Sequence, residues 1–276
     1  MANMKKAKVV VVTSGKGGVG KTTSTAALGA ALAQDGQRVA VVDFDIGLRN
    51  LDLMMGAERR VIYDLINVIQ GNANLNQALI RDKRLDNLHL LPASQTRDKN
   101  ALTEKGVLQV MDELREKFDW VICDSPAGIE RGAVLAMKHA DIAIIIANPE
   151  ISSVRDSDRI IGLLDAKTER AKNGQEVEKH LLITRFDTTR AGTGEMLEID
   201  DVSDILSIPL LGVVPESRDV LSASNLGIPV TLSDANSAPA RAYIDAAKRL
   251  CGEEIPITLP AEKRRLFASW FGGRAA

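Results

Sequence analysis

The chain has 276 residues, a mass of 29.8 kDa and a formal net charge of −2, with 45% hydrophobic and 26% charged residues. These values are ordinary for a soluble globular protein, and no apolar run approaches the roughly 20 residues of a spanning helix. The apolar run behind the N-terminal lysines is too short for a signal peptide, and two cysteines cannot build a disulfide framework. We therefore expect a cytoplasmic protein.

Short apolar runs alternate with longer segments of helical periodicity. The expected strands span residues 9–13, 39–43, 88–91, 120–124, 142–148, 181–184 and 210–214, with 229–232 as an edge strand. The expected helices span residues 22–34, 103–117, 131–139, 154–166, 195–206 and 238–250. The strands are apolar throughout, as in parallel strands covered on both faces. This order predicts an α/β fold with a mostly parallel central sheet and helices on both faces.

A glycine-rich loop lies between the first strand and the first helix. It consists of Gly15, Lys16, Gly17, Gly18, Val19, Gly20, Lys21, Thr22 and Thr23, with the spacing of a phosphate-binding loop. Glycines let backbone N–H groups surround phosphate oxygens, and the helix adds its positive N-terminal end. Lys21 should reach the β- and γ-phosphates, and the Thr22 hydroxyl should ligate Mg²⁺. The loop predicts an ATP and Mg²⁺ site of the P-loop NTPase type; the alternative is a glycine-rich turn with chance lysines.

Aspartates stand where two of the strands end. Asp43 ends the strand 39–43, Asp45 follows it, and Asp124 ends the strand 120–124. The carboxyl ends of parallel strands meet at one edge of a sheet, which is also the edge of the phosphate loop. Asp124 therefore fits a carboxylate that contacts Mg²⁺ through water, because Mg²⁺ keeps several waters. The alternatives are capping or solvated turn aspartates at Asp43 and Asp45, and a helix-capping aspartate at Asp124.

Lys16 makes the loop resemble the deviant Walker A motif, and with it the ParA/MinD family of ATPases, which includes partition ATPases and the nitrogenase iron protein. The resemblance implies that Lys16 crosses to the partner's nucleotide in an ATP-bound homodimer and stabilises charge during phosphoryl transfer. It implies that Asp45 positions the attacking water and that Asp43 helps to order water and Mg²⁺. It also places adenine near residues 184–186 and 214–216, which include Arg185 and Pro215. A solvated lysine on the loop rim is the alternative for Lys16.

The C-terminal residues differ from the rest of the chain. We predict that residues 1–252 form the ATPase domain, residues 253–260 a linker and residues 261–276 a short helix and tail. The segment 261–276 has a net charge of +3, so the rest of the chain has a net charge of −5. In a helix, Leu266, Phe267, Trp270 and Phe271 fall within an arc of about 140°. With the basic Lys263 and Arg264, this pattern predicts a membrane-targeting helix on anionic lipids. Packing onto the protein's own body is the alternative.

Further stretches narrow the resemblance to bacterial family members that select the cell-division site: residues 43–52, 92–99, 123–128 and 152–159. The resemblance implies a peripheral protein on the cytoplasmic face of the inner membrane. It implies as partners the division inhibitor MinC and the ATPase activator MinE. The implied partner surface includes Glu150, Ser152, Asp156 and Asp158. Alternatively, Ser152 or Ser153 caps a helix and the acidic residues form a solvated face.

Three other functions use parts of the same pattern. A DNA-partition ATPase would need a basic DNA-binding surface, which the negative body does not favour, so no nucleic-acid partner is expected. An iron–sulfur reductase would need ligand cysteines, and Cys123 and Cys251 do not supply a set. A nucleotide-binding scaffold without turnover would not need Lys16, Asp45 and Asp124 together with Lys21.

Overall fold

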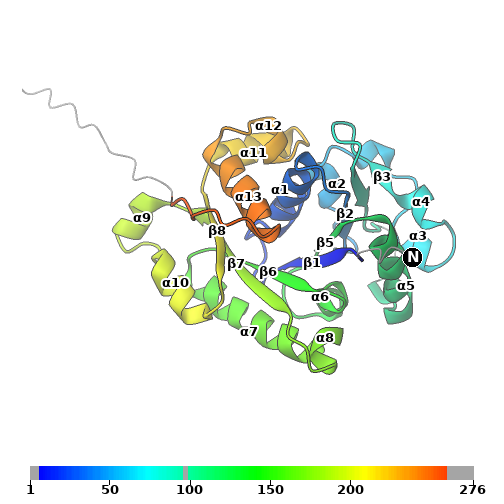
Figure 1. The fold of residues 1–276 in the computed structure, drawn as a ribbon, viewed down its shortest axis with the longest axis horizontal. Coiled ribbons are helices and arrows are strands. Elements are labelled where there is room, and N and C mark those ends of the chain that lie inside the picture. The colour runs from blue at the N-terminus through cyan, green and yellow to red at the C-terminus, as the bar shows by residue number, and fades with distance from the viewer. Residues whose placement is uncertain (1–5, 96–98, 260–276) are drawn as a thin grey trace, which may run out of the picture.

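The computed structural model describes residues 6–95 and 99–259 (Figure 1). Within them, one eight-stranded sheet has the order β3-β4-β2-β5-β1-β6-β7-β8. Its strands are β1 (Lys8–Thr13), β2 (Val39–Asp43), β3 (Ile80–Arg81), β4 (Leu88–Leu91), β5 (Trp120–Asp124), β6 (Ile142–Ala147), β7 (Glu178–Phe186) and β8 (Leu210–Pro215). Only the β3–β4 pair is antiparallel among these strands. The predicted mostly parallel sheet is confirmed.

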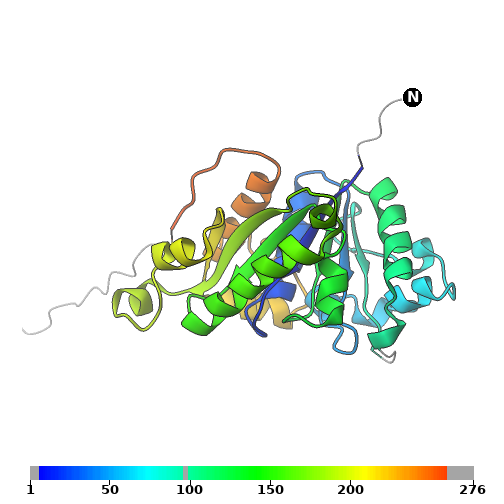
Figure 2. The same cartoon turned by 90° about the horizontal axis from the view of Figure 1, so that it is seen from below.

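Helices cover both faces of the sheet. They are α1 (Lys21–Gln34), α2 (Leu51–Met54), α3 (Leu65–Ile69), α4 (Leu75–Ala78), α5 (Glu104–Lys117), α6 (Arg131–Met137), α7 (Ile151–Lys167), α8 (Glu169–Lys172), α9 (Thr188–Gly192), α10 (Ile199–Leu206), α11 (Arg218–Asn225), α12 (Val230–Ser233) and α13 (Ala238–Leu250). Two short 3₁₀ helices span Glu58–Arg60 and Lys99–Ala101. Figures 1 and 2 show α1 and α13 on one side of the sheet, with α6 and α7 on the other.

The wholly apolar strands follow from this two-sided cover. Val10 and Val12 of β1 pack in the core cluster beneath α1 and α13, whereas Val9 and Val11 pack in the cluster beneath α5, α6 and α7. Successive side chains of a strand point to opposite faces, so a strand covered on both sides needs apolar residues at every position. In β1, β2 and β5 the polar residues accordingly stand at the strand ends, as Lys8, Thr13, Asp43 and Asp124 do.

The predicted edge strand 229–232 is wrong, because the chain forms α12 there. Pro229 caps this helix with φ −51°, a value that suits a helix start. Val230 and Thr231 are buried, and the Thr231 hydroxyl donates a hydrogen bond to the carbonyl of Ala27 in α1. A short apolar run fits a buried helical turn as well as a strand, so periodicity alone could not separate the two.

Several predicted bounds also shift. The helix predicted over 195–206 begins only at Ile199, after a capping box at Glu198. The helix predicted over 154–166 begins earlier, at Ile151, after Glu150 at its N-cap. Ser152 and Ser153 therefore lie inside it, and the alternative in which one of them caps the helix is wrong. The strand predicted over 181–184 extends to Glu178–Phe186.

The segment after α13 lies along β8 without helix or strand as far as Leu259. The Arg249 guanidinium holds it by donating hydrogen bonds to the carbonyls of Leu211, Ile255 and Pro256. The predicted membrane residues Lys263, Arg264, Leu266, Phe267, Trp270 and Phe271 lie outside the described residues. Within the described part, no helix has the length and apolar character needed to span a bilayer.

Candidate functional site

The glycine-rich loop connects β1 to α1 at the carboxyl end of the central strands. Gly18 and Gly20 have φ angles of +75° and +101°, which side chains rarely adopt. Gly20 caps the 14-residue α1 without a side-chain hydrogen bond, so the first N–H groups of the helix are not used by a cap. The geometry is therefore that of an anion site at a helix N-terminus.

Gly15 is required by a close contact with α7. A Cβ atom at this position would overlap the backbone of Asp156, so only glycine fits. The phosphate loop thus packs directly against the helix that carries the predicted partner surface.

Lys21 lies buried inside the loop. Its ammonium donates a hydrogen bond to Ser14 Oγ at 3.1 Å, and that hydroxyl donates to the carbonyl of Lys16 at 2.7 Å. Burial lowers the pKa of Lys21, while the carboxylates of Asp124 and Asp45 act in the opposite direction. Both carboxylates are therefore close to the lysine. A cation held in a partly dry loop interacts strongly with phosphate charge.

Asp43 and Asp124 stand side by side at the ends of β2 and β5, in direct register. Both are buried, and Asp124 accepts hydrogen bonds from the hydroxyls of Thr25, at 3.3 Å, and Thr22. Burial raises the pKa of Asp124 to about 7, and burial together with the charge of Asp124 raises that of Asp43 well above its usual value. Two adjacent buried carboxylates repel each other as anions, and a cation between them would relieve this repulsion.

The donor set fits Mg²⁺. Thr22, Asp43 and Asp124 offer the oxygen donors that this hard cation prefers. No group of three or more His, Cys, Asp or Glu side chains suited to a metal occurs in residues 6–95 and 99–259. Mg²⁺ in proteins usually takes one or two carboxylates and completes its shell with water and phosphate oxygens.

Asp43 also supports the capping alternative, since its oxygens accept the backbone N–H groups of Asp45, at 2.8 Å, and Leu51, at 3.3 Å. It therefore holds the loop that carries Asp45 and the start of α2. Within this loop Arg49 has φ +48° and pairs with the buried Asp52 at 2.8 Å. Positive φ at a non-glycine residue stores strain, which is typical of functional loops.

Lys16 points away from its own loop toward the start of α7. Its ammonium lies 2.7 Å from Glu150 Oε2 and donates to Ser152 Oγ at 3.1 Å. The side chains of Lys16 and Glu150 are 37% and 44% exposed, so this ion pair contributes only about 0–1 kcal/mol. Lys16 can leave it at little cost. The structure thus joins the predicted catalytic lysine to two residues of the predicted partner surface.

The other two residues of that surface do not join this contact. Asp158 is exposed, and Asp156 is half-buried and lies 3.6 Å from Arg159. Ser153, one residue beyond Ser152, accepts a hydrogen bond from the Asn148 backbone at 3.1 Å. The acidic residues fit either a partner surface or a solvated face.

A cavity of about 1140 Å³ opens beside the phosphate loop, large enough for a nucleoside. Arg185 and Pro215, predicted near adenine, both line it, together with Val19, Gly20 and Thr23 from the loop and α1. The Thr184 hydroxyl lies 2.6 Å from the carbonyl of Val19 and 2.9 Å from Asn148 Oδ1, which ties this end of the cavity to the loop. The cavity therefore continues from the phosphate loop.

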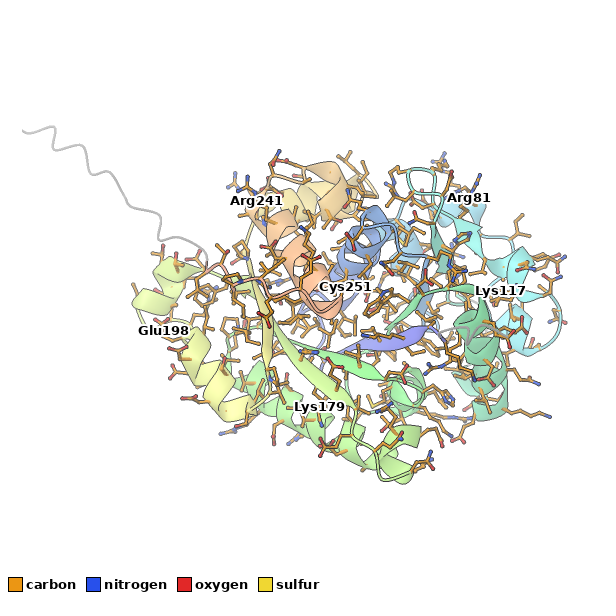
Figure 3. The ribbon with its side chains drawn as sticks, viewed as in Figure 1. Arg81, Lys117, Lys179, Glu198, Arg241 and Cys251 are labelled. Atoms are coloured by element: carbon orange, nitrogen blue, oxygen red, sulfur yellow. The ribbon has the colours of Figure 1, made fainter. Side chains whose placement is uncertain are left out.

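Sequence reasoning missed most of the cavity wall. Most of the missed lining residues come from α2, α11 and α13: Leu53, Met54, Arg218, Val220, Leu221, Ser224, Asn225 and Tyr243. Asp187 and Ser217, just before α9 and α11, were missed as well. Tyr243 is buried and within 3.0 Å of Ser24 Oγ in α1. No sequence motif marks these positions, since α2 and α11 are too short to show a clear periodicity. Neither cysteine lines the cavity: Cys123 is buried in β5. Cys251 is exposed after α13, where Figure 3 labels it.

The fold and the loop define a phosphate-loop nucleotide-binding protein. Residues 10–230 match the family model described as the CobQ/CobB/MinD/ParA nucleotide binding domain. The chain is 58% identical over 270 residues to the septum site-determining protein MinD of Escherichia coli (strain K12), covering 97% of this chain and 100% of that protein. It therefore belongs to the MinD family of septum site-determining proteins.

Solved structures of MinD proteins have the same fold as this chain. The MinD cell division protein of Aquifex aeolicus superposes with a TM-score of 0.81 at 39% identity, covering 92% of this chain and 100% of that one. The MinC:MinD complex of the same organism superposes with a TM-score of 0.80 at 40% identity, again covering 92% of this chain and 100% of that one. MinD of Pyrococcus horikoshii OT3, complexed with Mg-ADP, superposes with a TM-score of 0.78 at 29% identity, covering 88% of this chain and 96% of that one. The predicted family and fold class are confirmed.

Proposed function

We propose that this chain is a Mg²⁺-dependent ATPase that hydrolyses ATP to ADP and phosphate and works as a dimerising membrane switch in placing the division septum. One observation carries the proposal: buried Lys21 lies near Asp45 and Asp124 in a glycine loop that opens into a nucleoside-sized cavity. The Mg-ADP complex of the Pyrococcus horikoshii relative supports the same ligand here.

The residues divide the work between binding and chemistry. Lys21 and the loop N–H groups would hold the phosphates, and Thr22, Asp43 and Asp124 would hold Mg²⁺. When bound, Mg²⁺ supplies positive charge against the phosphate oxygens. Asp45 would orient the attacking water and accept its proton as the bond from the γ-phosphorus to ADP breaks. Lys16 would leave Glu150, cross the dimer interface and stabilise charge on the partner's nucleotide.

A change at Thr22 tests the metal site. Thr22→Val removes a hydroxyl ligand but keeps the shape of the side chain, so we expect half-maximal ATP hydrolysis to require about tenfold more Mg²⁺. A titration of phosphate release against Mg²⁺ measures this. Thr193→Val, an exposed position after α9, should leave the titration unchanged. An unchanged midpoint in Thr22→Val would contradict the assignment of Thr22 as a ligand.

Membrane attachment follows from the amphipathic segment and the dimer. A single short tail is a weak anchor because ordering it offsets much of its apolar burial. Two tails on one ATP-bound dimer bind together through their effective concentration. Hydrolysis would return monomers with one weak anchor each and release the protein from the cytoplasmic face of the inner membrane.

Deleting residues 261–276 should lower binding to anionic vesicles at least tenfold, because it removes both the apolar face and the basic residues. Affinity for ADP should stay within twofold, because the deletion keeps the phosphate loop and the described cavity lining, which runs from Val19 to Tyr243. Vesicle co-sedimentation and nucleotide titration measure the two effects. Retained vesicle binding would place the anchor elsewhere in the chain.

Partner recruitment is part of the same proposal. The Aquifex aeolicus MinC:MinD complex supports MinC as a partner of this chain in its ATP state. The start of α7, with Glu150 and Ser152, is the proposed surface, and MinE is the proposed activator that triggers release. Because Lys16 contacts both residues, dimerisation would change this surface directly.

A further inference from the structure

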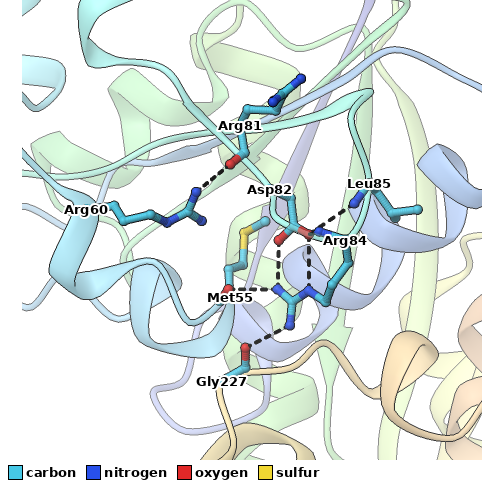
Figure 4. Close-up of polar contacts among 7 residues, drawn as sticks. All are labelled: Met55, Arg60, Arg81, Asp82, Arg84, Leu85 and Gly227. Carbon is cyan, nitrogen blue, oxygen red and sulfur yellow. Dashed lines mark hydrogen bonds and ion pairs between the residues drawn. The ribbon is translucent and has the colours of Figure 1, made fainter.

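A buried ion pair in the turn between β3 and β4 fixes one arginine in place (Figure 4). Asp82 is 4% exposed, and its carboxylate accepts hydrogen bonds from Arg84 Nε at 3.1 Å and Nη2 at 2.7 Å. The same carboxylate accepts the backbone N–H groups of Arg84 and Leu85. A two-point contact of this kind sets the orientation of the guanidinium plane.

The remaining donors of Arg84 connect two helices. Nη2 donates to the carbonyl of Met55 at 2.8 Å, and Nη1 donates to the carbonyl of Gly227 at 3.1 Å. Met55 follows the last residue of α2, and Gly227 follows α11 by two residues. The last carbonyls of a helix lack partners within it, so one side chain here satisfies a carbonyl at each of two helix ends.

The two helix ends are also in direct contact. A Cβ atom on Gly56 would lie 2.7 Å from the carbonyl oxygen of Gly227, and one on Gly227 would lie 2.8 Å from the Cα of Gly56. Both glycines have positive φ. The backbone therefore approaches as closely as glycine allows, and Arg84 holds it there.

Both helices form the cavity beside the phosphate loop. Leu53 and Met54 of α2 line it, as do Leu221 and Asn225 of α11. The helix α2 begins at Leu51, at the end away from Met55, and the N–H group of Leu51 donates to the carboxylate of the buried Asp43. The helix α2 thus runs from a proposed metal ligand to the contact that Arg84 fixes.

We propose that Arg84 is a positioning residue for nucleotide binding, which holds α2 against α11 and so sets the width of the nucleoside end of the cavity. This rests on the proposed function, in which a nucleotide occupies that cavity. Arg84 itself does not line the cavity, so it acts through the two helices. If Arg84 no longer holds α2 against α11, contacts with the nucleoside should weaken. The phosphate loop, which connects β1 to α1, should be unaffected.

The test compares ADP with inorganic triphosphate in competition against a fluorescent nucleotide. Arg84→Lys keeps the charge but cannot bind Asp82 at two points and both carbonyls together. We expect its affinity for ADP to fall about five- to tenfold and its affinity for triphosphate to stay within twofold. Asp82→Asn should show the same selective loss, because the guanidinium is no longer held.

Arg81→Lys is the matched control. Arg81 lies on the adjacent strand, its side chain is 64% exposed, and it pairs with the exposed Asp86 at 3.3 Å. Both affinities should equal those of the unchanged protein. A general loss of folding in Arg84→Lys would weaken ADP and triphosphate together, and this would overturn the positioning role, as would ADP binding within twofold of the unchanged protein. Failure of the unchanged protein to bind ADP would instead overturn the proposed nucleotide site.

Discussion

Lys16→Ala is expected to abolish ATP-dependent dimerisation and to lower activator-stimulated turnover by at least about a hundredfold. The ammonium of Lys16 contacts Glu150 and Ser152 at the start of α7, away from the phosphate loop of its own chain, and the proposal assigns it to the nucleotide of a second chain. Affinity for ADP should change less than twofold, because Lys21 is the lysine that the phosphate loop encloses. Light scattering on a sizing column with ATP, and phosphate release with activator, measure the two effects.

The exposed Lys105 on α5 provides the control for this change. Lys105→Ala removes one positive charge from a helix that contributes no residue to the cavity, so dimerisation and turnover should be unchanged. If Lys16→Ala also dimerises and turns over like the unchanged protein, the lysine has no role across the interface. Its contact with Glu150 would then be a surface ion pair and nothing more.

Asp45→Asn is expected to slow hydrolysis about a hundred- to thousandfold while the ATP-bound dimer still forms. Asparagine has nearly the same shape but cannot accept the proton of the attacking water. Asp45 is half-buried, and its charge acts to raise the pKa of Lys21, so its carboxylate lies on the same side of the sheet edge as the proposed phosphate site. Single-turnover hydrolysis and light scattering on the same sample separate chemistry from assembly.

Asp200→Asn, an exposed aspartate in the first turn of α10, should affect neither measurement. Two results would contradict the role of Asp45. Hydrolysis at the unchanged rate would mean that another group activates the water. Loss of the dimer would mean that the carboxylate contributes to ATP binding or assembly rather than to the chemical step.

The sequence predicted the arrangement at the phosphate-loop edge of the sheet, because local rules apply there. Parallel strands bring their carboxyl ends to one edge, so Asp43 and Asp124 could be placed together without a structure. The glycine loop follows an apolar strand and opens a helix, and each of these features can be read over a few residues. The strand predicted over 229–232 failed for the opposite reason, since a four-residue, mostly apolar segment fits either a strand or a buried turn of helix.

Contacts between distant segments could not be predicted. Glu150 and Lys16 are 134 positions apart, and Gly227 and Arg84 are 143 apart. Nothing near Arg84 in the sequence indicates that its side chain donates hydrogen bonds at the ends of two helices. Its partners at those ends are backbone carbonyls, which every residue type has. The cavity wall formed by α2 and α11 was missed because these helices are too short to show a clear periodicity and lie far apart in the sequence.

The claim that links the nucleotide site to the membrane is tested most directly by co-sedimentation of the whole protein with anionic vesicles, in Mg²⁺–ATP and in Mg²⁺–ADP. We predict that the protein pellets with vesicles in ATP and stays in the supernatant in ADP, because only the ATP-bound dimer presents two anchors. Equal pelleting in both nucleotides, or none in either, would contradict the switch.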